Sequence, residues 1–283
     1  MDKYNVYQDM SRRTGGEIYL GIVGPVRTGK STFIKRFMEL VVIPEMADDN
    51  EKVRTIDELP QSADGKTIMT TEPKFIPKEA AVIHFSNQET GKIRLIDCVG
   101  YLVPEAVGAI EEEKERMVKT PWSEEEIPFS KAAEIGTSKV IREHSNLGLI
   151  ITTDGSFGDI PAVNFEEALQ KTVMECEKAG KPFLILVNTS RPDSQETIQF
   201  TKRLEAQYGK TVMAVNCKTM DREDVFRIME QLLADFPITR LNFLLPKWVE
   251  FLQPDNWLKQ DLIEKCRNVI QKVHTMKDIQ DDS

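Results

Sequence analysis

The sequence has no long apolar run, no secretion signal and no excess of basic residues. No stretch approaches the roughly 18 consecutive apolar residues of a membrane span, so we expect no direct membrane insertion. The N-terminus lacks a basic region followed by an apolar one, which predicts no secretory signal and a cytoplasmic location. The formal net charge of −9 argues against binding to nucleic acid and against electrostatic docking on anionic lipid.

The sequence also has few of the residues that build disulfides and zinc sites. Its four cysteines are scattered without a CxxC pair, and its three histidines are isolated. Scattered cysteines in a cytosolic protein are most often buried thiols, so we predict neither a disulfide nor a zinc site. No Ser–His–Asp or paired-carboxylate arrangement is visible. With 283 residues, 40% of them hydrophobic, the chain can form one large globular domain or one and a half.

Short aliphatic runs alternate with longer amphipathic stretches, which is typical of an α/β protein with a mostly parallel sheet. We expect an antiparallel hairpin at 74–85 and 92–96, and we interpret 42–65 as a loop and the charged stretch 100–129 as a solvated lid. The other expected strands are 17–23, 147–153, 182–187 and 211–215, and the expected helices are 31–40, 130–144, 165–179, 194–208 and 222–236.

A phosphate-binding motif follows the first expected strand. Residues 24–31, GPVRTGKS, match GxxxxGK[ST] between a buried strand and a helix, the context that such a loop requires. Backbone N–H groups and the positive helix end would surround the phosphates, Lys30 would reach their oxygens, and the Ser31 hydroxyl would ligate Mg²⁺. The expected nucleotide-binding residues are Gly24, Arg27, Thr28, Gly29, Lys30, Ser31, Thr32, Gly100 and Asn188.

Two further segments complete the expected catalytic site. Asp97 ends an apolar strand and begins a DxxG sequence with Gly100, which predicts an aspartate that holds Mg²⁺ through a water. Thr70 and Thr71 lie between the 42–65 segment and the hairpin, where GTPase-like P-loop proteins place a threonine that senses the γ-phosphate and the metal. The predicted fold is therefore a P-loop NTPase three-layer sandwich of Ras-like topology, with one antiparallel hairpin strand in a mostly parallel sheet.

The residues expected to select the base and to activate water depart from the GTPase pattern. A GTPase of this fold would carry Asn-Lys-x-Asp after the strand at 182–187, and its aspartate would accept two hydrogen bonds from guanine. Here Asn188 is present, the lysine is missing and Asp193 lies beyond a proline, which favours ATP or weak base selectivity. Tyr101 stands where Ras-like enzymes have a water-orienting glutamine. We therefore expect slow or partner-dependent hydrolysis, with Arg27 as a possible charge stabiliser.

The α/β rhythm ends near Pro237. We predict a P-loop ATPase domain at 1–237 and the start of a second, mainly helical domain at 238–283, with a helix from 257 to about 276. The hypothesis that follows is that the chain is part of a longer protein.

With these motifs in view, the sequence resembles the stage IV sporulation protein A family, over essentially the whole chain. The resemblance is carried by RTGGEIYLGIV (13–23), KRFMELVV (35–42), DELPQS (57–62), GKTIMTTEPKF (65–75), DCVGY (97–101), AAEIG (132–136) and ITTDG (151–155). It implies an ATPase with a GTPase-like fold that hydrolyses ATP with Mg²⁺. It also implies that Lys30 belongs to Walker A, Asp97 to Walker B, and Thr70 and Thr71 to the sensor position.

The resemblance further implies a biological setting. In this family, ATP hydrolysis drives self-assembly into a homopolymer on the mother-cell side of the forespore, where spore-coat proteins assemble on it. Regions beyond this chain would contact coat proteins and a membrane-bound anchor peptide. Two alternatives stay open from the sequence: a GTPase-type switch read through the Thr70 loop, and a non-enzymatic scaffold that nucleotide only stabilises.

Overall fold

The computed structural model describes residues 17–46, 48–60, 72–84, 90–106, 110–111, 114–234, 238, 241–273, 275 and 278. The chain divides into two compact units, residues 1–232 and 233–283. The first unit contains a six-stranded sheet in the order β10-β9-β8-β1-β3-β2. Its strands are β1 (Glu17–Val23), β2 (Lys74–His84), β3 (Thr90–Asp97), β8 (Leu147–Thr153), β9 (Phe183–Asn188) and β10 (Val212–Val215).

All neighbouring strands of the sheet are parallel except β2, which pairs antiparallel with β3. Every residue of β8 and β9 is buried, as expected for parallel strands that helices cover on both faces. This burial explains why these two segments are apolar throughout instead of alternating. The carboxyl ends of β1, β3, β8 and β9 meet at one edge of the sheet, which is where open α/β sheets bind their ligands.

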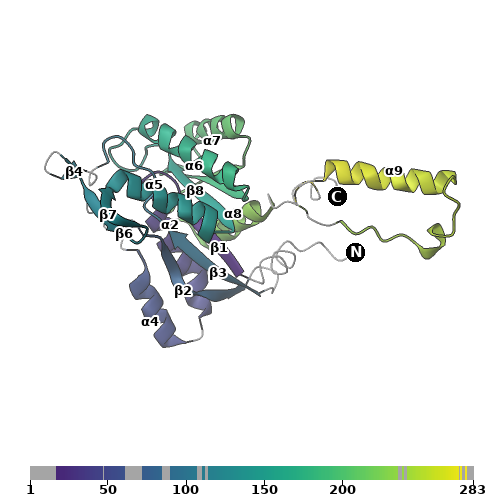
Figure 1. The fold of residues 1–283 in the computed structure, drawn as a ribbon, viewed down its shortest axis with the longest axis horizontal. Coiled ribbons are helices and arrows are strands. Elements are labelled where there is room, and N and C mark those ends of the chain that lie inside the picture. Colours follow the sequence, from purple (N-terminus) through teal and green to yellow (C-terminus); the bar gives the residue numbers. More distant parts are fainter. Residues whose placement is uncertain are drawn as a thin grey trace. The chain divides into compact units, whose positions relative to one another are not determined.

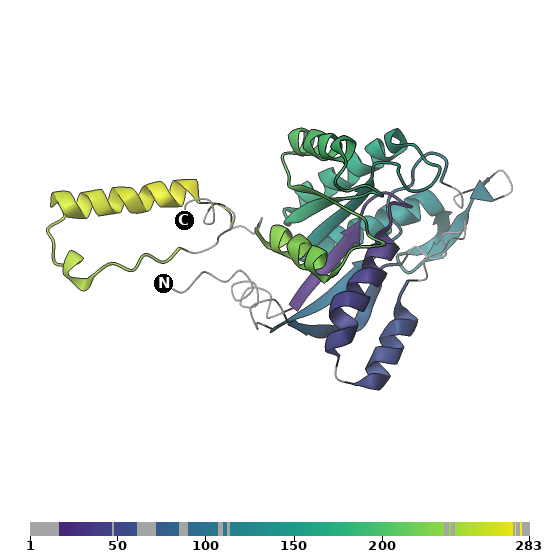
Figure 2. The same cartoon turned by 180° about the vertical axis from the view of Figure 1, so that it is seen from behind.

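Helices cover both faces of the sheet. Figure 1 shows α5 (Phe129–Lys139) and α6 (Glu166–Ala179) in front of it, and Figure 2 shows α2 (Lys30–Phe37) and α8 (Arg222–Ala234) on the other face. The front layer, completed by α7 (Gln195–Tyr208), packs Val173 and Leu204 against Ile150 and Ile185 of the sheet. The predicted three-layer α/β sandwich of Ras-like topology, with one antiparallel hairpin strand, is thus confirmed.

The segment 42–65, expected to be a loop, is largely helical within its described part, so that expectation was wrong. The helix α2 runs on through a π-helical turn, Met38–Val42, into the short α3 (Ile43–Glu45), and α4 (Asp49–Glu58) follows. The side chain of Asp48 caps α4 by accepting a hydrogen bond from the Asn50 backbone N–H. Thr55 is the only buried residue of α4, so the segment lacks the apolar stripe that reveals a helix in a sequence.

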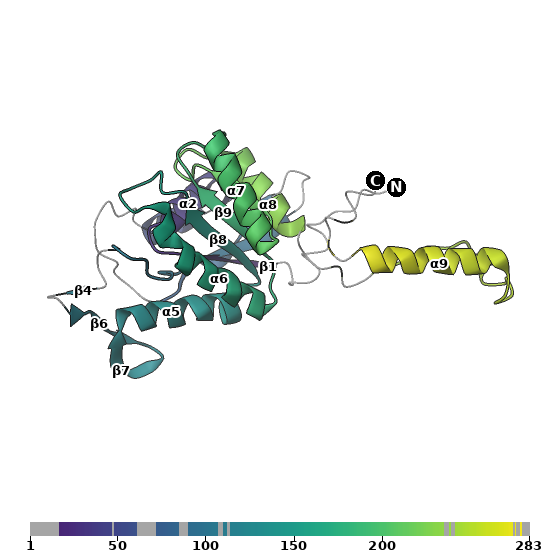
Figure 3. The same cartoon turned by 90° about the horizontal axis from the view of Figure 1, so that it is seen from above.

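The charged stretch 100–129 contains two short antiparallel hairpins. One pairs β4 (Ile110–Glu111) with β5 (Lys114–Glu115), and the other pairs β6 (Met117–Thr120) with β7 (Ser123–Pro128). Figure 3 shows β6 and β7 beside α5, and the Phe129 N–H donates to the Arg116 carbonyl at 2.8 Å. The glutamates of β7 are exposed, as expected for a solvated segment.

The second unit has little regular structure in its described part. It contains a 3-10 turn, Lys247–Val249, and the helix α9 (Trp257–Lys272), which the Asn256 side chain caps at its start. No residue of α9 is buried, and Trp257 is 75% exposed. The domain boundary at 237 stays a prediction. Among the described residues, no helix combines the length and apolarity needed to cross a membrane.

Candidate functional site

The loop after β1 has a shape that only glycine permits at two positions. Gly24 and Gly29 have φ angles of 129° and 94°, which L-residues with a side chain rarely adopt. A β-carbon on Gly24 would lie 2.3 Å from the Ile151 carbonyl oxygen, and one on Gly29 would lie 2.3 Å from Asn188 Nδ2. The loop therefore packs closely against the carboxyl-terminal parts of β8 and β9.

The same loop is held from within and leads directly into α2. The buried Thr28 hydroxyl donates to the Pro25 carbonyl at 3.0 Å, and Lys30 is the first residue of α2. The loop thus ends at the positive N-terminal end of α2, and Ser31 and Thr32 lie in the first turn of that helix. Arg27, which lies in the same loop, has a φ of 64° and an exposed side chain.

The ammonium group of Lys30 is buried inside this loop. Its Nζ donates to the carbonyl of Pro25 at 2.5 Å and to that of Gly24 at 3.3 Å. Burial lowers the pKa of Lys30, and the nearby Asp97 opposes that effect. Because a buried cation is costly unless anions surround it, this lysine is well suited to receive phosphate oxygens.

Asp97 ends β3 opposite Ile22 of β1. Its Oδ1 atom is buried and has no hydrogen-bond partner among the described residues. Burial raises the pKa of Asp97 to about 6, while the positive charges of Lys30 and Lys74 oppose this rise. A buried carboxylate oxygen without a partner costs free energy, so the position fits a bound cation or its water ligand.

The segment after Asp97 lies directly against the phosphate loop. Gly100 has a φ of 93°, and a β-carbon on it would lie 2.0 Å from the Gly24 carbonyl oxygen and 2.7 Å from Lys30 Nζ. The Val26 N–H donates to the Tyr101 carbonyl at 2.9 Å. Tyr101 is 6% exposed and packs in an apolar cluster with Val26 and Phe165. Its buried side chain cannot orient a water as the glutamine of Ras-like enzymes does.

Asn188, at the end of β9, links the phosphate loop to the segment that follows β10. Its Nδ2 donates to the Thr28 carbonyl at 3.0 Å, and its Oδ1 accepts a hydrogen bond from the Cys217 N–H at 3.1 Å. Both of its polar atoms thus bind backbone groups, while the expected contact of Asn188 with nucleotide stays a prediction. These bonds help to hold the loop in place.

Sequence reasoning missed Asp154, which follows β8. Its Oδ2 accepts a 2.6 Å hydrogen bond from the Thr189 hydroxyl, and its Oδ1 accepts one from the Ser156 N–H at 3.0 Å. Burial acts to raise the pKa of Asp154, but the hydrogen bonds from Ser156 and Thr189 outweigh burial and lower it. Asp154 follows β8, the neighbour of the strand that leads into the phosphate loop, and an aspartate at that strand end was the signal in the sequence.

The structure thus brings Gly24, Lys30, Asp97 and Gly100 together at the carboxyl edge of the sheet. The expected sensor threonines, Thr70 and Thr71, lie outside the described residues. Three of the four cysteines are buried free thiols, and Cys266 is partly buried. No group of three or more His, Cys, Asp or Glu side chains suited to a metal occurs in the described part of the chain. One carboxylate plus phosphate oxygens is, however, a common way for proteins to hold Mg²⁺.

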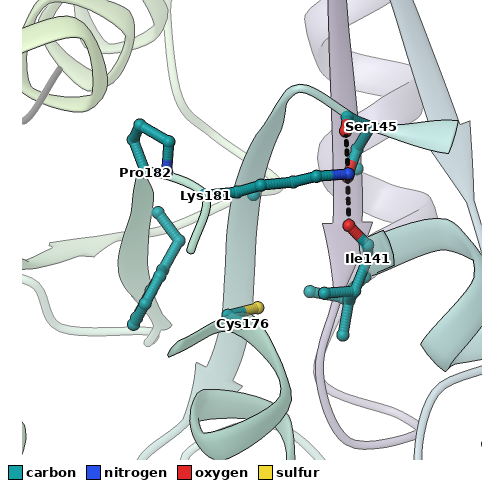
Figure 4. Close-up of a pocket in the computed structure, with 9 residues that line it drawn as sticks. Ile141, Ser145, Cys176, Lys181 and Pro182 are labelled. Atoms are coloured by element: carbon teal, nitrogen blue, oxygen red, sulfur yellow. Dashed lines mark hydrogen bonds between the residues drawn. The ribbon is translucent and has the colours of Figure 1, made fainter. Parts of the chain in front are cut away.

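A small cavity lies beside the first residues of β8 and β9 (Figure 4). It holds about 10 Å³, roughly the space of one water, between Ile141, Cys176 and the start of β9. Beside it Lys181 donates to the carbonyls of Arg142 at 2.7 Å and Ser145 at 2.5 Å, where a helix ends. Lysine is favourable at a helix end, so this region is explained by packing and capping.

Comparison with known proteins gives two family matches. Residues 1–237 match the family described as "Stage IV sporulation protein A, ATPase domain", and residues 238–283 match "Stage IV sporulation protein A, middle domain". Among solved structures, a mutant variant of SsGBP covers 80% of this chain and 58% of its own at 14% identity, with a TM-score of 0.42. A likeness that weak adds nothing to the fold assignment, which the strand order supports by itself.

Curated relatives match nearly the whole chain. The Stage IV sporulation protein A of Bacillus subtilis (strain 168) is 46% identical over 279 residues, 99% of this chain and 57% of the relative. The proteins of that name from Bacillus anthracis and Clostridioides difficile (strain 630) are 46% and 45% identical, covering 57% and 56% of those relatives. The chain spans somewhat more than half the length of these relatives, and the resemblance predicted from its motifs is confirmed. With its ATPase and middle domains both matched, the chain belongs to the stage IV sporulation protein A family.

Proposed function

We propose that this chain binds ATP with Mg²⁺ at residues 24–32 and hydrolyses the bond between the β- and γ-phosphates. The observation that carries the proposal is that Lys30 and Asp97 lie near each other beside the glycine loop. Lys30 is a buried cation, and Asp97 has a buried carboxylate oxygen that finds no hydrogen-bond partner among the residues that the structure describes. The ATPase name of the matched family supports adenine nucleotide as the substrate.

Each residue has a distinct role in this proposal. The loop N–H groups bind phosphate oxygens, and Lys30 turns from the Pro25 and Gly24 carbonyls toward them. Ser31 holds Mg²⁺ directly and Asp97 holds it through a water, while Thr70 or Thr71 senses the γ-phosphate. When bound, the metal neutralises the negative charge of the phosphates. Gly100, which packs against the Gly24 carbonyl beside Lys30, would turn toward the γ-phosphate.

We also propose that hydrolysis is coupled to self-assembly of the spore-coat basement layer around the forespore, on the mother-cell side. Membership of a sporulation family supports this role. The polymer would consist of copies of this protein. Coat proteins and a membrane-bound anchor peptide would bind through regions beyond this chain, because it spans only 57% of its relatives.

The test compares Lys30→Ala with Lys35→Ala. Both lysines lie on α2, but Lys35 is exposed and makes only a surface ion pair with Glu39. We expect Lys30→Ala to weaken ATP binding at least 100-fold by calorimetry and Lys35→Ala to leave it unchanged. Asp97→Ala and Thr70→Ala should mainly slow turnover, and light scattering should report assembly.

Three outcomes would contradict parts of the proposal. A strong preference for GTP at equal concentrations would favour the switch alternative. Assembly that proceeds in Lys30→Ala without nucleotide would favour a non-enzymatic scaffold. Equal ATP binding by the Lys30 and Lys35 variants would remove the phosphate site from residues 24–32.

A further inference from the structure

We propose that Arg191 selects adenine by donating a hydrogen bond from its guanidinium to the ring nitrogen N1 of the base. The inference rests on the nucleotide binding proposed above and adds the residue that reads the base. It follows from where Arg191 lies, how firmly its backbone is held, and what a guanidinium can bind.

The position of Arg191 follows from Asn188. This asparagine is bonded to the Thr28 carbonyl, and its Nδ2 leaves no room for a β-carbon on Gly29. The end of β9 is thereby locked to the phosphate loop. Arg191 stands three residues after Asn188, the spacing at which an Asn-Lys-x-Asp segment carries its guanine-binding carboxylate. A cation therefore occupies the position of the carboxylate.

The direction of a bound nucleotide follows from the strand order. Asp97 ends β3 on one side of β1, whereas Asn188 ends β9 on the other side, beyond β8. The phosphate loop follows β1 and lies between them. With the γ-phosphate and the metal on the Asp97 side, the base extends toward Asn188 and Arg191.

The backbone of Arg191 is held at both of its polar groups. Its N–H donates to the Thr189 hydroxyl at 3.2 Å, and its carbonyl accepts hydrogen bonds from the Thr197 hydroxyl at 3.0 Å and the Ser194 N–H at 3.1 Å. Thr189 is fully buried and donates in turn to Asp154 at 2.6 Å. The Ser190 N–H donates to the Ser156 hydroxyl at 2.8 Å. The side chain at 191 thus projects from a fixed backbone.

The chemistry of the guanidinium fits adenine at this place. Arginine carries five N–H donors and no acceptor. Guanine presents two donors on this edge, N1–H and the 2-amino group, which a carboxylate accepts and a cation repels. Adenine presents N1 as an acceptor and has no 2-amino group. In the structure Arg191 Nη2 lies 3.5 Å from Glu196 Oε2, but both side chains are more than two-thirds exposed. A pair this exposed is weak, so the guanidinium can turn toward a base at little cost.

Asp193 does not take this place. It follows Pro192 and faces a groove of about 340 Å³ along β10, together with Met213 and Arg227. The groove lies beside the outer strand of the sheet, and it is also lined by Val215, which pairs with Asn188. Asp193 stands two residues beyond the spacing at which an Asn-Lys-x-Asp segment carries its carboxylate.

The experiment measures binding of four nucleotides with Mg²⁺ to the full chain by calorimetry. ATP and purine riboside triphosphate carry N1 as an acceptor, whereas GTP and inosine triphosphate carry N1–H. For the unaltered chain we expect the first two to bind about tenfold more tightly than the last two. Arg191→Asp should shift the ATP-to-GTP affinity ratio at least tenfold toward GTP, and Arg191→Ala should leave little preference.

Arg203→Asp is the matched control, because it makes the same charge change on an exposed arginine of α7 whose surface partner is Glu166. It should keep the ratio of the unaltered chain. Inosine triphosphate binding as tightly as ATP, or an unchanged ratio in Arg191→Asp, would overturn the inference while ATP turnover still stood. Loss of turnover with the binding pattern intact would instead contradict the proposed hydrolysis.

Discussion

Replacing Asp97 by asparagine should stabilise the metal-free protein at neutral pH. Oδ1 of Asp97 is buried without a hydrogen-bond partner in the described part of the chain, and burial raises the pKa of Asp97 from 3.8 to about 6. The folded state therefore binds a proton more tightly than the unfolded state does. Stability from this group is present at low pH and is lost as the pH rises toward 6 and above.

The magnitude follows from the pKa difference. A rise of about two pKa units corresponds to roughly 3 kcal/mol of lost unfolding free energy at pH 7.5, and to about half of that at pH 5. Asparagine has a similar shape and no charge. Asp97→Asn should therefore be more stable than the unaltered chain by up to about 3 kcal/mol at pH 7.5 in EDTA, and the difference should shrink on acidification.

Urea denaturation between pH 5 and 8 provides the assay, and Asp154→Asn is the control. Both aspartates lie at carboxyl ends of parallel strands, but hydrogen bonds lower the pKa of Asp154. Its charge therefore contributes stability above the unfolded pKa, and Asp154→Asn should destabilise the protein at pH 7.5. If Asp97→Asn were the less stable variant at pH 7.5, or if its effect did not change with pH, the reasoning from burial would be refuted.

Two further predictions concern backbone contacts. Gly100→Ala should lower the unfolding free energy by about 3 kcal/mol, because the new β-carbon would lie 2.0 Å from a backbone oxygen. Gly158 has a similar φ, but a β-carbon there would meet no atom within 4 Å, so Gly158→Ala should lower the unfolding free energy by only about 1 kcal/mol. Equal urea midpoints for the two variants would refute the close contact. Asn188→Ala should cost about 2 kcal/mol, since it leaves the Cys217 N–H without its partner. It should also raise KM for ATP more than it lowers kcat, and an unchanged KM would exclude a role in positioning the loop.

Local pattern was enough to predict the sheet and the phosphate loop. Strands such as β8 and β9 are apolar along their whole length because both faces are covered, and that signal can be read without tertiary information. The glycine–lysine–serine motif is likewise local, since a strand, a tight turn and a helix start fit within about fifteen residues. The helix α4 was missed because a cap and surface propensity form it without an apolar stripe.

The tertiary structure decided how the residues around the loop act. No sequence pattern showed that Tyr101 is buried in an apolar cluster, or that Asn188 uses both polar atoms on backbone groups of Thr28 and Cys217. Those contacts join segments separated by up to 160 residues, and their energies depend on distances that only packing sets. The sequence by itself determined that the chain forms a Ras-like sheet and that a phosphate-binding loop follows its first strand. The folded chain decided that Asp97 Oδ1 has no hydrogen-bond partner among the described residues and that the backbone of Arg191 is held in place, because burial and hydrogen-bond partners exist only once distant strands meet.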